Sequence, residues 1–85
     1  MVRSFSAWKA WAIVKLTEIR RKYAGNPKVT QAVDVLVNRL ERLRLDSLAP
    51  LLADLHRAST DTPEFLEILP KEEEVVEWFQ GGGEE

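Results

Sequence analysis

The sequence predicts a small all-α protein in which four helices form a single bundle over residues 1–80. Apolar residues recur three and four positions apart over long stretches, which is the spacing of an amphipathic helix. No stretch alternates apolar and polar residues over the length of a strand. The 85 residues suffice for one hydrophobic core and one domain. We expect residues 81–85 to form a flexible Gly/Glu tail.

The first helix is predicted over residues 5–24. Ser4 or Ser6 supplies the N-cap oxygen, and Gly25 supplies the C-terminal stop. One face of this helix carries an apolar stripe with the expected spacing. Its members are Phe5, Trp8, Ala12, Leu16, Ile19 and Tyr23.

The second helix is predicted over residues 27–44, because Asn26 is a good N-cap and Pro27 suits the first helical position. Its apolar stripe consists of Val29, Ala32, Val33, Leu36, Leu40 and Leu43, with Val35 and Val37 lying off it. The short connection predicts that the first two helices pack antiparallel as a hairpin.

The second half of the chain is predicted to hold two further helices, over residues 48–58 and 63–80. The third begins after Asp46 or Ser47 and buries a stripe of leucines. In the fourth, Pro63 marks the start, and Pro70 interrupts the helix because proline lacks a backbone N–H.

The first helix carries more apolar surface than one stripe accounts for. Ala7, Ala10, Trp11 and Val14 form a second patch behind or beside the stripe. One interpretation is that later helices cover this helix on two sides. A second is an interface with another copy or another protein, with Trp11 as the anchor. Membrane-surface attachment is a third, disfavoured because the best stripe is needed for the core.

We expect an interaction module that uses the second patch. Its partner is predicted to be another copy of the chain, as a homodimer or larger, or a different protein, and not a membrane.

The last helix offers a possible docking peptide. Val75, Trp78 and Phe79 have an aliphatic-to-aromatic spacing that resembles that of sliding-clamp binding peptides, with Glu72 where those peptides carry glutamine. The alternative that we favour is an ordinary terminal helix that packs Val75, Val76 and Phe79 on the core.

The two halves of the chain carry opposite charges. Residues 1–45 hold ten basic and three acidic residues, a net charge of +7, whereas residues 46–85 hold two basic and eleven acidic residues, a net charge of −9. This asymmetry indicates either a charged partner or attraction between the halves within one fold.

The alternative function is therefore a nucleic-acid-binding accessory protein that contacts phosphates through the basic hairpin of the first two helices. Its candidate contacts are Lys9, Lys15, Arg20, Arg21, Lys22, Lys28, Arg39, Arg42 and Arg44. Cations near helix C-termini also complement the helix dipole without any ligand.

The residues needed for catalysis are scarce. Cysteine is absent, His56 is the single histidine, and no Gly-rich phosphate loop lies between a strand and a helix. The acidic cluster of Glu72, Glu73, Glu74 and Glu77 is interpreted as a solvated helix face. We expect no enzyme activity, no metal and no cofactor. We also expect an intracellular, cytoplasmic location, since a chain without cysteine fits a reducing compartment.

Overall fold

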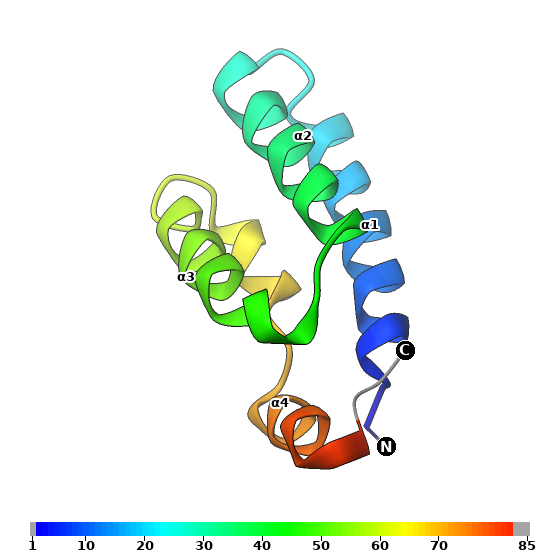
Figure 1. Cartoon of the computed structure of the whole chain (residues 1–85). Helices are drawn as coiled ribbons and strands as arrows, with labels where there is room; N and C mark the ends of the chain where they lie inside the picture. Colours follow the sequence, from blue (N-terminus) through cyan, green and yellow to red (C-terminus); the bar gives the residue numbers. More distant parts are fainter. Residues whose placement is uncertain (1, 83–85) are drawn as a thin grey trace.

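Two antiparallel helices, α1 (Phe5–Lys22) and α2 (Pro27–Glu41), form the hairpin that the short Asn26-Pro27 connection predicts (Figure 1). The structure is a computed structural model that describes residues 2–82, and its extents are 41 × 23 × 20 Å. The predicted all-α helical bundle is confirmed, with no strand among the described residues.

Both hairpin helices begin where the capping residues predict. The Ser4 hydroxyl accepts a hydrogen bond from the backbone N–H of Ala7 at 3.0 Å. The Asn26 side chain accepts from the N–H groups of Lys28 and Val29. These contacts satisfy amide groups that have no partner within the helix.

Both helices end two or three residues earlier than the sequence predicts. α1 ends at Lys22 rather than residue 24, and α2 ends at Glu41 rather than residue 44. After α2 the N–H of Leu43 bonds to the carbonyl of Leu40, so the chain tightens into a turn. This turn buries Leu43 to 7 % exposure and leads into the second half of the bundle.

Among the described residues, the second half of the chain contains one long helix, α3 (Leu48–Ala58). Its elements are η1 (Leu45–Ser47), α3 (Leu48–Ala58), η2 (Pro63–Ile68), α4 (Glu72–Glu77) and η3 (Trp78–Gly82). The third predicted helix is therefore confirmed over residues 48–58. The fourth is divided at Leu69 and Pro70 as expected, but its first part, η2, is a tighter 3₁₀ helix.

The helical conformation of the last segment breaks at the first residue of the predicted tail. Gly81, near the end of η3, has a φ of +108°, a non-helical value that side chains disfavour. Residues 83–85 of the predicted tail lie outside the described residues.

The core is formed by the predicted stripes and by the C-terminal segment. Its buried members are Phe5, Trp8, Ala12, Leu16, Ile19, Val29, Val33, Leu36, Leu40, Leu43, Leu48, Leu51, Leu55, Phe65, Ile68 and Trp78. Trp78 lies 5.3 Å from Phe5 and 5.6 Å from Trp8 between ring centroids, in tilted geometry. This aromatic cluster joins α1 to η3, so the two ends of the described chain share one core.

Candidate interaction surfaces

The outward face of α1 is left uncovered by the other helices. Ala7, Ala10 and Val14 are exposed, with Val14 at 56 %, and Trp11 is half-buried at the edge. We call these four residues the α1 face. Later elements do cover both flanks, as one interpretation predicted, because Trp11 and Ile13 pack against the core. They do not reach the alanines or Val14.

Trp11 is held in position by a cation. The Arg3 guanidinium lies 4.6 Å from the centroid of the Trp11 ring. Such a contact orients the ring and stabilises it by roughly 0.5–1 kcal/mol where it is solvent-exposed.

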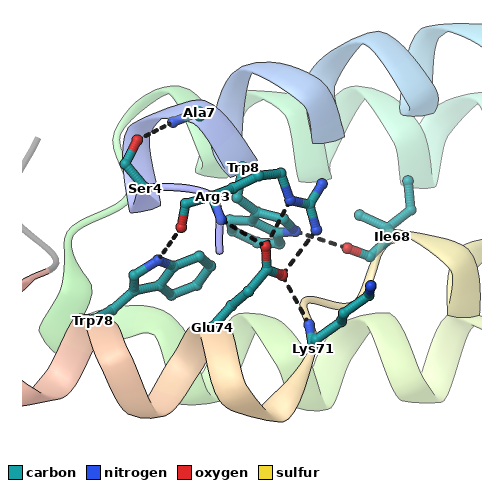
Figure 2. A network of polar contacts seen from close by, with 8 residues as sticks. All are labelled: Arg3, Ser4, Ala7, Trp8, Ile68, Lys71, Glu74 and Trp78. Carbon is teal, nitrogen blue, oxygen red and sulfur yellow. Dashed lines mark hydrogen bonds and ion pairs between the residues drawn. The ribbon is translucent and has the colours of Figure 1, made fainter. Parts of the chain in front are cut away.

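Arg3 also anchors α4 to the start of α1 (Figure 2). Its Nε and Nη2 donate to the two carboxylate oxygens of Glu74 at 2.7 and 2.8 Å, and its backbone N–H donates at 3.2 Å. The N–H of Lys71 donates to the same carboxylate at 3.0 Å. The Arg3 hydrogen bonds lower the pKa of Glu74 from 4.5 to about 2, against the opposing effect of burial.

The prediction that Glu72, Glu73, Glu74 and Glu77 form one solvated face is wrong for Glu74, which is only 2 % exposed. The other three glutamates are exposed. A buried carboxylate needs a partner, and Arg3, 71 residues away in sequence, provides it.

The prediction of a C-terminal docking peptide is contradicted by the burial of Trp78. Trp78 is 1 % exposed and donates its indole N–H to the carbonyl of Arg3 at 2.8 Å. Val75 is half-buried, and Phe79 points outward at 57 % exposure. The favoured alternative, in which Val75, Val76 and Phe79 face the core, is wrong for Val76 and Phe79, since both are exposed. Trp78 is a core residue and is not available as a peptide anchor in this fold.

Many candidate nucleic-acid contacts are paired with acids of the same chain. Lys22 pairs with Glu64 at 2.5 Å, and Lys28 pairs with Asp61 at 3.0 Å. Arg39 and Arg57 both bind Asp54, and their hydrogen bonds, with that of Arg39 first, lower the pKa of Asp54. Attraction between the two halves, predicted as one cause of the charge asymmetry, is present in the fold.

The first half also pairs within itself. Arg20 binds Asp34 at 2.8 Å across the hairpin, and Lys15 lies 3.5 Å from Glu18 one turn away. Lys9 reaches the carbonyl of Leu43 and lies over the Phe5 ring.

Three candidate cations have no ion pair within residues 2–82. Arg21 is in the last turn of α1, whereas Arg42 and Arg44 follow α2. Because the helices are antiparallel, these cations lie at opposite ends of the hairpin (Figure 1). The structure therefore does not gather the unpaired arginines into one patch.

A groove between α2 and α3 was missed by the sequence analysis. It is a shallow depression of about 610 Å³ that is widely open to solvent. Its apolar lining includes Ala32, Val35, Leu36 and Ala58. We call it the α2–α3 groove. Val35, noted above as lying off the main stripe, was the available signal, and it is 56 % exposed.

Other kinds of site find no support in the described part of the chain. Within residues 2–82 no group of three or more His, Cys, Asp or Glu residues is placed to hold a metal ion. Every buried side-chain nitrogen or oxygen there has a hydrogen-bond partner. No helix in this range has the length and apolar character required to cross a membrane.

Comparison of the chain with protein-family models, with curated proteins and with solved structures finds no match.

Proposed function

We propose that this chain is a small, non-catalytic helical interaction module that self-associates through the α1 face. The observation that carries this proposal is that Ala7, Ala10 and Val14 remain exposed on the longest helix, beside the half-buried Trp11. The solvent-facing side of a helix is expected to be polar, so an apolar patch there is expected to be covered by a partner. Trp11 has the size and the partial exposure of a binding anchor.

A second copy is the occupant that the pattern of this face favours. In a two-fold antiparallel pair each residue meets the residue at the mirrored position of the other copy. Centring the pair between Ala10 and Trp11 places Ala7 opposite Val14. It also places Ala10 of each copy opposite Trp11 of the other. The face is therefore self-complementary in size, with each small side chain facing a larger one.

The small residues determine how close the two helices can pack. Ala7 and Ala10 carry only a methyl group, so a partner helix can approach at the short end of the usual 8–10 Å interaxial range. Trp11 then covers the contact from one side. We expect an interface of modest area, hence an association that depends on protein concentration.

The experiment is absolute mass by light scattering at about 0.5 M salt, where charge–charge contacts are strongly screened. We expect the wild-type chain to reach twice its mass of 9.7 kDa with rising concentration. Val14→Glu should stay at the mass of one chain and remain helical, because this position is exposed and glutamate favours helix. Leu66→Glu, at a 46 % exposed position outside the α1 face, is the control and should still dimerise. A wild-type chain that stays at 9.7 kDa up to about 1 mM would reject self-association.

The antiparallel register has its own test. The chain contains no cysteine, so Ala10→Cys introduces a single thiol close to the expected two-fold axis. Oxidation should link two copies rapidly, since a disulfide needs Cα atoms within about 7 Å. Ala24→Cys, exposed beyond the end of α1, is the matched control and should link slowly. Equal rates for the two variants would reject this register.

The expected cytoplasmic location and the absence of catalysis stay predictions. The nucleic-acid alternative also stays a prediction. The ion pairs described above leave few unpaired cations on the hairpin, so we do not advance it as a second function.

A further inference from the structure

The α2–α3 groove combines an apolar floor with a positively charged rim. Ala32, Leu36 and the 56 % exposed Val35 supply apolar surface. Lys28, Arg39 and Arg57 also line the groove, together with one acid, Asp54. Asp54 accepts hydrogen bonds from both arginines, and Lys28 pairs with Asp61 at 3.0 Å, so these three cations and two carboxylates keep a net positive charge. A ligand that fits this surface is apolar along its centre and acidic at its edges.

The outward side of α4 and η3 has the complementary character. Val76 and Phe79 are 46 % and 57 % exposed, and their three-residue spacing places them on one helix face. The neighbouring Glu72, Glu73 and Glu77 are exposed and form no ion pair with any described residue, and they outnumber the one adjacent cation, Lys71. We call these five residues the α4 ridge.

The ridge cannot reach the groove of its own chain. Glu74 and Trp78, on the inward side of α4 and η3, are bonded to Arg3 next to the start of α1. The groove is lined by α2 and by the C-terminal half of α3. In Figure 1, α4 lies below both helices at one end of the molecule, away from these segments. Any contact between the two surfaces therefore joins different molecules.

We propose that the α4 ridge of one copy docks in the α2–α3 groove of a second copy. Phe79 and Val76 enter the apolar floor, and the glutamates face Lys28, Arg39 and Arg57. The contact is head to tail, because the two surfaces differ, so a bound pair still offers one free groove on the first copy and one free ridge on the second. Assembly by this contact is open-ended, unlike the closed pair through the α1 face. The proposal goes beyond the proposed function and does not depend on it, since it uses other surfaces.

Charge complementarity favours this occupant. Within residues 46–82, the acids that form ion pairs are Asp54, Asp61, Glu64 and Glu74. The acids left on the ridge are therefore surplus to folding. The contact involves few residues, so we expect weak association that weakens further as salt screens the charges.

The experiment uses the full chain carrying Val14→Glu, which removes the contact through the α1 face. Two further variants each add one substitution at a position of nearly equal exposure, Val35→Glu in the groove or Phe79→Glu on the ridge. Light scattering over a concentration series at about 0.05 M salt is the measurement, and circular dichroism checks that each variant is folded. We expect the Val14→Glu chain to grow beyond one copy with concentration. Each added substitution should hold the mass at 9.7 kDa.

The decisive sample is the equimolar mixture of the two double variants. One retains an intact ridge and the other an intact groove, so together they form a single contact. The mixture should approach twice the chain mass and grow no further, and about 0.5 M salt should dissociate it. A Val14→Glu chain that stays monomeric throughout would overturn the proposal. So would a mixture that stays monomeric while the Val14→Glu chain grows, because the contact would then lie elsewhere. Either failure leaves the α1-face experiment, read at high salt, unaffected.

Discussion

The α1–α2 hairpin and the C-terminal segment over residues 63–82 are stabilised in different ways. In the hairpin, apolar stripes with helical spacing face each other, and each helix begins at a side-chain cap. In the C-terminal segment the helices are short, and the Trp78 indole, the Ile68 carbonyl and the buried Glu74 carboxylate bind partners in the first eight residues of the chain. The hairpin is specified mainly by local pattern, whereas the segment is specified by contacts far apart in sequence.

This difference explains why the buried face was predicted correctly for α1 but not for α4 and η3. Five turns of α1 repeat the same apolar spacing, so a single polar residue in the stripe would not change which side of the helix is predicted to be buried. α4 and η3 offer few residues and two possible apolar faces. Trp78 and Glu74 settle the choice, because both find hydrogen-bond partners only when turned toward Arg3.

The largest effect on stability is expected from Trp78, which determines the buried side of η3. Trp78→Ala should lower the free energy of unfolding by about 3–5 kcal/mol, as for other buried aromatic residues replaced by alanine. Phe79→Ala, its 57 % exposed neighbour, should change it by no more than about 0.5 kcal/mol. Urea titration of both variants measures the contrast. Equal losses would show that the terminal turn faces the core differently from the structure described here.

A smaller effect, dependent on pH, is expected from Glu74. Its folded pKa of about 2 lies below the ordinary 4.5, so the unfolded chain binds this proton more readily. The resulting stability is present above pH 4.5 and is lost as pH falls toward about 2. The loss is on the order of 3 kcal/mol.

Stability measured between about pH 5 and pH 2 tests this assignment. Glu74→Gln should be less stable at neutral pH and should flatten the acid dependence. Glu73→Gln, at an exposed neighbour, should retain the wild-type slope. The assignment would be rejected if both variants had the slope of the wild type.

The smallest effect is expected at the basic end of the hairpin, where it tests the nucleic-acid alternative. Lys22 and Lys28 pair with acids of the C-terminal segment and the loop before it, and Arg20 pairs with Asp34. We therefore expect a short DNA duplex to bind weakly. Affinity should fall with salt at a logarithmic slope near −0.9, the value for about one phosphate contact.

Fluorescence anisotropy over a salt series measures this slope, with Arg21→Glu as the test variant and Leu66→Glu as the control. A slope steeper than about −2.7, for three or more phosphates, would show that the ion pairs exchange partners on binding and would support the alternative. A shallow slope that Arg21→Glu abolishes would leave only incidental contact.

The sequence alone determined most of the local structure. Ser4, Asn26 and Pro27 set the starts of the first two helices, and Pro70 separates the two parts of the last segment. These effects need only neighbouring atoms, and repeated apolar spacing then identifies the buried stripe of each long helix. The residues of the α1 face were identified in the same way.

Only the tertiary structure decided which surfaces stay open and how α4 is turned. Whether another helix covers Ala10 or Val35 depends on where α3 and η2 pack, which no local pattern encodes. The partner of Glu74 lies 71 residues away, and an unpaired carboxylate would be too costly to bury. Contacts of this kind form only when the ends of the chain meet, so the C-terminal segment acquires its orientation from the fold.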